Sequence, residues 1–213
     1  MLQRFMGATL LLAPFLLGGT VITQPDGLAP NSYRLAFVTS VGRDALSGNI
    51  SDYNTFVTNV ANTVPALAQF QWRAIVSTAT VDARDNIGGV DSTPIYNLAG
   101  QLVAKGTSEL WSGFLRNPIF VTELGDAPPN PFQVWTGTNI DGTKDAKNPA
   151  GTPGFTMIGS ANHDNPPWIH NILKPSAEFR LIYAISIPEP SSAALLLSGA
   201  VLLLLAGRWR HQL

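Results

Sequence analysis

Cysteine is absent from this 213-residue chain, and that absence excludes several kinds of chemistry at once. No disulfide can stabilise the fold, and no thiolate can ligate zinc or act as a nucleophile. Small exported domains often depend on disulfides. If this chain is exported, its folded part must be stabilised by packing alone.

Charge is also scarce, because Lys, Arg, Asp and Glu together make up 13% of the chain and the net charge is -1. Proteins that bind nucleic acid carry basic patches or runs, and the sequence has neither. The Gly-x-Ser-x-Gly pattern of many serine hydrolases is missing too. We therefore expect no nucleic-acid partner, and no common hydrolase motif indicates an enzyme.

Long apolar runs occur only at the two ends. At the start, Arg4 provides a positive charge, an apolar segment follows from Phe5 to Leu17, and the small residues Gly18-Gly19-Thr20 come next. This order is typical of a secretory signal peptide. We expect residues 1-29 to comprise a signal peptide and a short linker, cut by signal peptidase near Thr20 or as late as Ala29. An uncleaved N-terminal anchor is the alternative.

At the other end, Pro188-Glu189-Pro190 precedes an apolar run from Ala193 to Ala206, and Arg208 and Arg210 follow it. The prolines break the chain before the run, and the arginines favour the cytoplasmic side of a membrane. We expect a transmembrane helix over 191-207. A core of about 14 to 16 residues would span roughly 21 to 24 Å, less than the roughly 30 Å of bilayer hydrocarbon.

This arrangement over 188-213 resembles the PEP-CTERM sorting signal, whose processing signal would be Pro188, Glu189 and Pro190 with Arg208 and Arg210 behind the helix. The resemblance implies export through the inner membrane and processing by an exosortase-type enzyme. It further implies membrane anchoring before processing, and then a place at the cell surface or in the extracellular matrix. A permanent C-terminal anchor that is never cut is the alternative.

Residues 30-187 remain, enough for one domain with a substantial core. Apolar residues alternate over 33-39 in the manner of a half-buried strand. Asn49 or Ser51 would cap a helix that ends near Pro65. A short second helix would begin at Thr107 or Ser108 and direct Leu110, Trp111, Phe114 and Leu115 inward. Strands over 70-77 and 179-185 and a long irregular region from Ile119 complete an α+β pattern in which the first and last strands could pair.

The segments Phe70 to Ile87, Pro94 to Leu98, Leu110-Trp111 and Val134 to Gly142 resemble the endostatin-like branch of the C-type lectin-like fold. The resemblance implies an α+β domain with two helices and a long loop region over 30-187. Animal members of that branch rely on cysteine pairs, and this chain has none.

Candidate ligand-binding residues are concentrated in the Gly/Asn/Asp-rich region that runs from Trp135 to Trp168. Asn139, Asp141 and Asp145 place side-chain oxygens around a glycine turn, a pattern compatible with calcium. Calcium prefers about six to eight oxygens, and the same residues also make ordinary turns. The metal is therefore unknown and no cofactor is required. The true C-type lectin calcium motifs, Glu-Pro-Asn and Gln-Pro-Asp, are absent.

Trp168 lies beside two prolines in this polar region, and we expect its ring to be exposed enough to stack on a sugar. His163, Asp164 and His170 could bind zinc or share a proton, although a surface loop with incidental histidines is the simpler interpretation. Trp72, Trp111 and Trp135 are expected in the core.

Three functions are compatible with these features. The favoured one is a non-enzymatic, exported surface or matrix protein that binds exopolysaccharide or another matrix component. The second is a secreted hydrolase that uses acids among Asp141, Asp145 and Asp164. The third is a structural matrix component without a discrete ligand.

Overall fold

The structure is a computed structural model, and it describes residues 19-187. The expected transmembrane helix and the sorting-signal residues Pro188, Glu189, Pro190, Arg208 and Arg210 lie outside this range, as does the apolar part of the expected signal peptide. No helix within 19-187 is both long enough and apolar enough to cross a bilayer.

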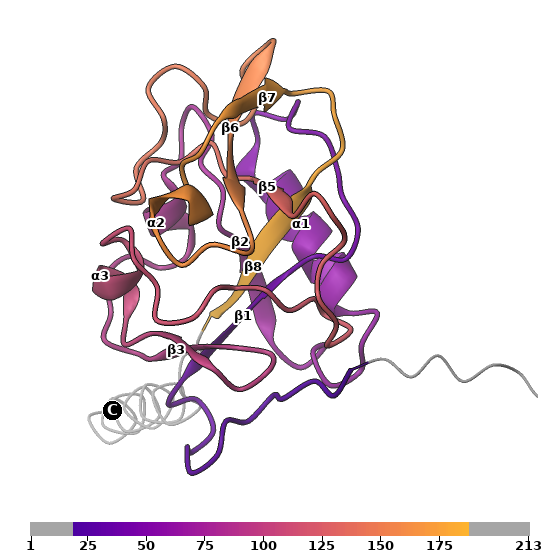
Figure 1. Ribbon diagram of the computed structural model, residues 1–213, viewed down its shortest axis with the longest axis vertical. Helices are drawn as coiled ribbons and strands as arrows, with labels where there is room; N and C mark the ends of the chain where they lie inside the picture. Colours follow the sequence, from indigo (N-terminus) through magenta and orange to yellow (C-terminus); the bar gives the residue numbers. More distant parts are fainter. Residues whose placement is uncertain (1–18, 188–213) are drawn as a thin grey trace, which may run out of the picture.

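The domain has an α+β fold with a mixed eight-stranded sheet and a few short helices, as expected for the fold class (Figure 1). The strand order is β4-β3-β1-β8-β5-β6-β7, with β2 also paired to β8. The elements are β1 (Arg34–Val38), α1 (Ile50–Ala61), β2 (Gln71–Ala74), α2 (Ala83–Asn86), β3 (Ile95–Asn97), β4 (Leu102–Ala104), α3 (Thr107–Leu110), β5 (Gln133–Trp135), β6 (Phe155–Ser160), the 3-10 turn η1 (Pro166–Trp168), β7 (Leu173–Pro175) and β8 (Leu181–Ile187).

Strand β8 is the centre of the sheet, and it crosses the middle of Figure 1 beside β1 and β2. It pairs antiparallel with β1, where Phe37 lies opposite Ala184, and antiparallel with β2, where Trp72 lies opposite Ser186. Its first residues pair in parallel with β5. The expected pairing of the first and last strands is therefore confirmed.

Both faces of the sheet are covered. Leu35 and Phe37 of β1 belong to the core cluster beneath α1, whereas Ala36 and Val38 belong to a second cluster that also contains Trp111 and residues of β8. All five residues of β1 are buried. The expectation of a half-buried β1 is therefore wrong, because apolar residues from other segments, among them Ile75, Ile95 and Trp111, cover the face that was expected to meet solvent.

Helix α1 forms where the apolar spacing predicts it. Asn49 is the N-cap and its side chain accepts a hydrogen bond from the Ser51 amide, which satisfies one of the free donors of the first turn. Tyr53, Val57 and Val60 are buried against the sheet. The helix ends at Ala61, before Pro65, and its opposite face is polar.

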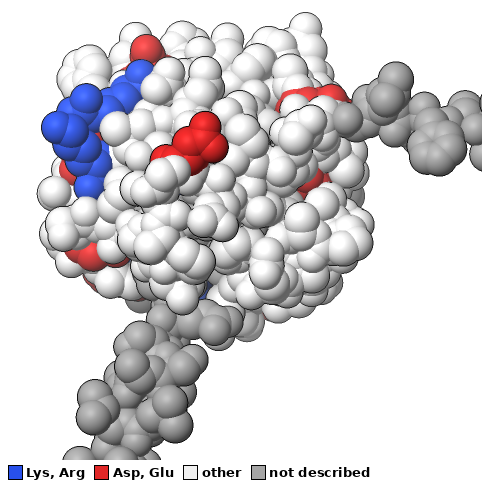
Figure 2. All heavy atoms as spheres, turned by 90° about the horizontal axis from the view of Figure 1, so that it is seen from below, with Lys and Arg blue, Asp and Glu red and all other residues white. Residues whose placement is uncertain are grey.

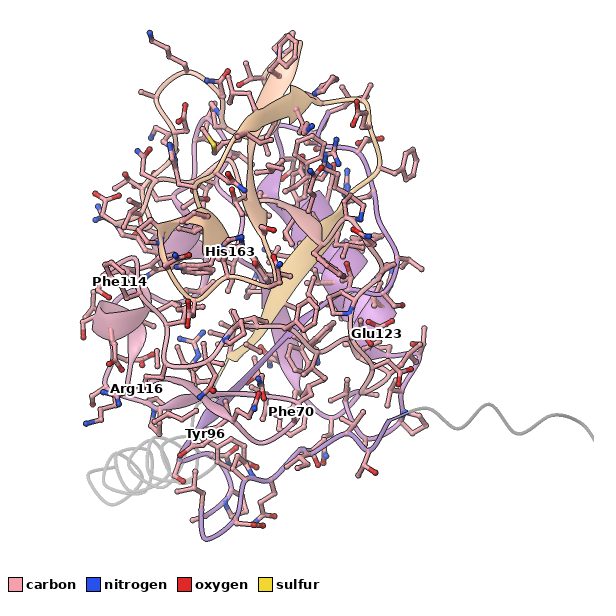
Figure 3. The ribbon with its side chains drawn as sticks, viewed as in Figure 1. Phe70, Tyr96, Phe114, Arg116, Glu123 and His163 are labelled. Carbon is pink, nitrogen blue, oxygen red and sulfur yellow. The ribbon has the colours of Figure 1, made fainter. Side chains whose placement is uncertain are left out.

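Helix α3 begins at Thr107 as expected, but it is a single turn and ends at Leu110. Leu110, Trp111 and Leu115 are buried, whereas the expected inward position of Phe114 is wrong because 60% of this residue is exposed. Figure 3 shows Phe114 at the edge of the molecule beside α3. Gly113, with φ 88°, turns the chain after the helix and takes Phe114 off the helical face.

Two buried tyrosines lead to a prediction at alkaline pH. Burial raises the pKa of Tyr183 and of Tyr53 above the ordinary 10.0, and Arg43 opposes the rise only in part at Tyr53. A raised folded-state pKa adds stability that is complete below pH 10 and is lost as the pH rises above it. We expect these tyrosines to ionise only as the domain unfolds, with tyrosinate absorbance and loss of circular dichroism in one transition. Gradual ionisation of all four tyrosines in a folded domain would contradict this assignment.

Candidate functional site

The loop that contains Asn139, Asp141 and Asp145 is a tight turn whose polar side chains bond within the loop. One Asp141 carboxylate oxygen accepts hydrogen bonds from the Thr143 amide, at 3.0 Å, and from the Thr143 hydroxyl, at 2.6 Å. The Asn139 amide donates to the Lys144 carbonyl. Asp145 accepts from the backbone amides of residues 147 and 148. The three residues are therefore adjacent, but their hydrogen-bonding groups stabilise the turn.

These bonds also favour the ionised form of Asp141. The hydrogen bonds from Thr143 lower the pKa of Asp141, with a smaller lowering contribution from Arg84. Within 19-187, no group of three or more acidic, histidine or cysteine side chains lies close enough to hold a metal ion. A calcium-binding role for this loop stays a prediction that rests on the sequence.

The expected exposure of Trp168 is wrong, because its exposed fraction is 0%. The two prolines form the 3-10 turn η1, and this turn directs the indole inward. The ring stacks on Trp111, with centroids 6.2 Å apart, and lies 5.7 Å from the ring of Tyr183. Trp168 therefore belongs to the second core cluster and cannot stack on a sugar at the surface.

The two histidines of this region make separate contacts. Nδ1 of His163 lies 3.1 Å from the side-chain oxygen of Asn165, and Nδ1 of His170 lies 3.1 Å from the Thr138 carbonyl. His170 lines a shallow hollow of about 370 Å³ together with Asn139, Ile140 and Asp141. Trp72, Trp111 and Trp135 are buried as expected.

A larger hollow lies between the polar face of α1 and strand β2, and we call it the α1–β2 groove. It measures about 440 Å³ and is lined by Ser51, Asn54, Thr55, Thr58, Asn59, Asn62, Ala68, Phe70, Gln71, Trp72 and Arg73. Helix α1 is 12 residues long, so the wall that it forms is about 18 Å in length. In β2 the side chains alternate, so Gln71 and Arg73 are exposed in the groove while Trp72 and Ala74 are buried.

One lining residue of the groove has a structural role. The Asn54 amide oxygen accepts from the Ala74 amide at 2.9 Å, and its nitrogen donates to Asn86. Within 19-187, no hydrogen bond or ion pair engages the side chains of Asn59, Gln71 or Arg73. The groove therefore presents amide and guanidinium groups that are available to a ligand.

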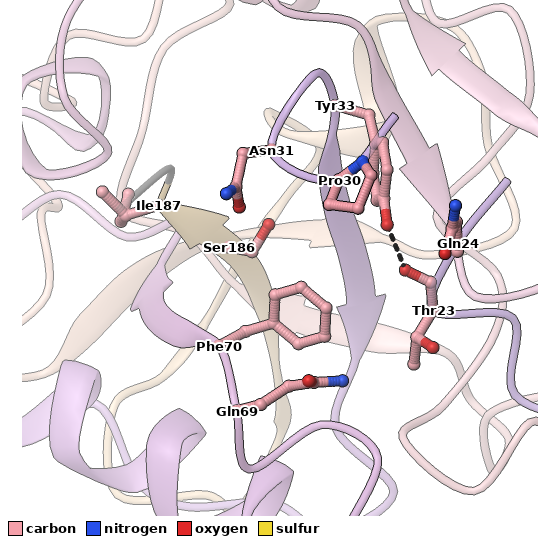
Figure 4. Close-up of a pocket in the computed structure, with 9 residues that line it drawn as sticks. All are labelled: Thr23, Gln24, Pro30, Asn31, Tyr33, Gln69, Phe70, Ser186 and Ile187. Atoms are coloured by element: carbon pink, nitrogen blue, oxygen red, sulfur yellow. Dashed lines mark hydrogen bonds between the residues drawn. The ribbon is translucent and has the colours of Figure 1, made fainter. Parts of the chain in front are cut away.

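A second hollow of about 330 Å³ lies beside the groove (Figure 4). The N-terminal segment forms one wall, and Gln69, Phe70, Ser186 and Ile187 form the other; the N-terminal lining residues are Thr23, Gln24, Pro30, Asn31 and Tyr33. The Tyr33 hydroxyl donates to the Thr23 carbonyl at 2.7 Å and fixes the segment on the domain.

Phe70 joins the two hollows, because it lines both of them. It is half-buried and packs edge-on against Trp72, with centroids 6.0 Å apart. Arg73 is the only charged residue among the described residues that line either hollow. Figure 2, which shows the molecule from below, shows a surface of mostly uncharged atoms with one cluster of Lys and Arg at its edge and a few acidic patches.

The motifs of the sequence do not predict this surface, although a signal is present in α1. Polar residues recur at Ser51, Thr55, Asn59 and Asn62 with helical spacing, and none of them is charged. A solvated helical face usually carries Lys, Glu or Arg, which favour helix and keep the surface soluble. Asn, Thr and Ser favour helix less than Lys, Glu or Arg do. Their presence along one helical face is a reason to expect a binding role there.

Comparison with known proteins gives no assignment, since no family model matches the chain and no curated protein matches it either. The arrangement of the described residues, together with the sequence of the two ends, must therefore support any functional conclusion.

Proposed function

We propose that this protein is exported, sorted to the cell surface or extracellular matrix by its PEP-CTERM tail, and binds polysaccharide there without enzymatic activity. An exosortase-type enzyme would process the tail. The support for sorting is the sequence of the two ends, namely the apolar start and the Pro188-Glu189-Pro190 motif followed by an apolar run and arginines.

The fold assignment in this proposal is the endostatin-like branch of the C-type lectin-like fold. Its support is the order of the matching segments, the pairing of β1 with β8, and a helix between β1 and β2. The absence of cysteine is a difference from the animal members of that branch.

The binding proposal rests on the α1–β2 groove, in which Phe70 lies at the junction with the second hollow. Ligand sites combine an apolar or aromatic surface with a few polar groups that fix orientation. Amide side chains can donate and accept at once, which suits sugar hydroxyls. The phenyl face of Phe70 offers an apolar contact for a sugar ring. The Arg73 guanidinium can donate two parallel hydrogen bonds to a carboxylate. Polymers that contain uronic acid are the favoured ligands.

The proposal predicts a pattern of binding defects in the full, purified protein. Dextran is the neutral probe and alginate is the acidic one. Asn59→Ala and Phe70→Ala should each weaken binding of both polymers by roughly tenfold, since one lost contact of about 1.4 kcal/mol corresponds to a factor of ten. Arg73→Ala should weaken alginate binding by a similar factor and leave dextran binding unchanged. Isothermal titration calorimetry measures each constant.

Asp141→Ala is the matched control, because it lies in the 139-145 turn away from the groove lining. Its affinity should equal that of the parent. If Asp141→Ala weakens binding and the groove variants do not, the turn is the site and the groove proposal is wrong. Release of sugar from either polymer, stopped by changes at Asp141, Asp145 or Asp164, would instead favour the hydrolase alternative. Absence of binding to both polymers would leave only the structural role.

A further inference from the structure

The N-terminal segment forms a fixed wall of the second hollow. The Ile22 amide donates to the Leu98 carbonyl at 2.9 Å, beside β3, and Leu28 packs against the core cluster beneath α1. The hydrogen bond from Tyr33 to Thr23, dashed in Figure 4, holds the same segment at the hollow itself. Because this wall is held by the domain, a ligand that enters the hollow has little chain to order.

Three amide side chains line this hollow, those of Gln24, Asn31 and Gln69 (Figure 4). The side-chain nitrogens of Gln24 and Gln69 each donate to a nearby backbone carbonyl. Within 19-187, no hydrogen bond engages the side chain of Asn31, and none ends on the amide oxygens of the two glutamines. The hollow therefore offers free acceptors and a free donor, which suit hydroxyl groups.

The two hollows differ in charge. Arg73 lines the α1–β2 groove, whereas no charged residue is present among the described residues that line the second hollow. A carboxylate in the second hollow would lose water without gaining a counter-charge, which is unfavourable. A neutral sugar meets no such cost there, so the groove favours an acidic unit and the second hollow a neutral one.

The two hollows also follow one another along strand β2. Phe70 precedes the strand and lines both hollows, and Arg73 lies three residues further on, about 10 Å away at the rise of a strand. Gln71, between them, is paired with Ile187, which lines the second hollow. One polymer chain that crosses Phe70 can therefore contact both hollows.

We propose that the second hollow is a subsite for a neutral sugar within the same binding site as the groove, so that the protein selects a linear heteropolymer in which neutral units adjoin a uronic acid. This inference rests on the proposed polysaccharide binding. The uronic acid pairs with Arg73, the neutral unit contacts Asn31, and Phe70 lies between them. Because one chain engages both subsites, the second contact is intramolecular and adds affinity.

The first test compares three octasaccharides by isothermal titration calorimetry with the full, purified protein. The dextran octasaccharide is neutral, the alginate octasaccharide is acidic throughout, and the octasaccharide from deacylated gellan carries glucuronic acid between neutral sugars. The gellan octasaccharide should bind roughly tenfold tighter than either of the others, since one added contact corresponds to about that factor. If it binds no tighter than the alginate octasaccharide or the dextran one, the inference is wrong and groove binding stands. If none of the three binds, the inference and the proposed function both fail.

The second test isolates the Asn31 side chain. Asn31 has φ 65°, a left-handed conformation that glycine adopts without strain, so Asn31→Gly removes the amide group and keeps the backbone. This variant should bind the gellan octasaccharide roughly tenfold more weakly than the parent and the alginate octasaccharide equally well.

Asn171→Gly is the matched control, because it makes the same change at an exposed asparagine that lines neither hollow. It should bind both octasaccharides as the parent does. Equal affinities of the two variants for the gellan octasaccharide would overturn the role of the second hollow, and an equal loss of alginate binding in Asn31→Gly would overturn its preference for a neutral unit.

Discussion

Trp135→Ala should lower the free energy of unfolding by about 3 to 5 kcal/mol, which is the usual cost of removing a large aromatic side chain from a core. Trp135 is the last residue of β5 and is fully buried beneath the chain around Arg43. Its indole nitrogen donates to the Arg43 carbonyl at 2.9 Å, and the Arg180 guanidinium lies 5.4 Å from the ring centroid. The change removes the packing, one hydrogen bond and one cation–π contact together.

Denaturant unfolding followed by circular dichroism measures this effect. Because the chain has no disulfide, no covalent link limits the loss of stability. Phe114→Ala is the matched control, since 60% of Phe114 is exposed and its removal should change the free energy by less than about 0.5 kcal/mol. Equal effects at Trp135 and Phe114 would show that the core has been assigned wrongly.

The second large effect concerns a buried ion pair. The Arg34 side chain is 0% exposed, and it donates to Asp91 at 3.1 Å and to the carbonyls of Ser186 and Ile87 at 2.8 Å. Burial lowers the pKa of Arg34, and the charge of Asp91 opposes that shift. Asp91→Ala would leave a buried guanidinium without its counter-charge. We expect a loss of about 3 kcal/mol, at the lower end for broken buried pairs because Asp91 is 30% exposed.

Two further variants serve as comparisons, one at Asp91 itself and one at an exposed ion pair elsewhere. Asp91→Asn keeps an oxygen acceptor and should cost about half as much as the alanine change. Asp85→Ala removes a 67% exposed partner of Arg84 and should cost less than about 1 kcal/mol. Chemical denaturation measures all three. If Asp91→Ala costs no more than Asp85→Ala, the pair does not stabilise the fold.

The parts of the fold that depend on local pattern could be predicted from the sequence. The apolar stripe and the Asn49 cap identify α1, and the alternating residues of β1 place Leu35 and Phe37 on one face. The first and last strands pair as expected. These features follow from periods of 3.6 and 2 residues, which are visible in short windows.

Other parts depend on contacts between distant segments and could not be predicted in this way. Strands β3, β4 and β7 have three residues each, too few for a period to be visible. Trp168 looks exposed in a Pro- and Asn-rich sequence, yet its neighbour in space is Trp111, 57 positions earlier. The wall of the groove combines α1 with the segment 68-73, and only the folded structure brings them together.

The candidate site illustrates the same limit. Asn139, Asp141 and Asp145 have the composition of a binding loop, and in the structure the side-chain nitrogen of Asn139 and one carboxylate oxygen of each aspartate bond within the turn itself. Asn59 and Gln71, which composition alone did not mark, present side chains to a groove. Residue type is similar in the two places, and the hydrogen-bond partners make the difference.

NMR chemical-shift mapping of the purified protein with alginate oligomers would locate polysaccharide binding and show whether it occurs in the α1–β2 groove. If the groove is the site, backbone amide signals from α1 and from residues 68-73 shift on titration, while those of 139-145 stay in place. Shifts confined to 139-145, or no shift at saturating oligomer concentration, would contradict binding in the groove.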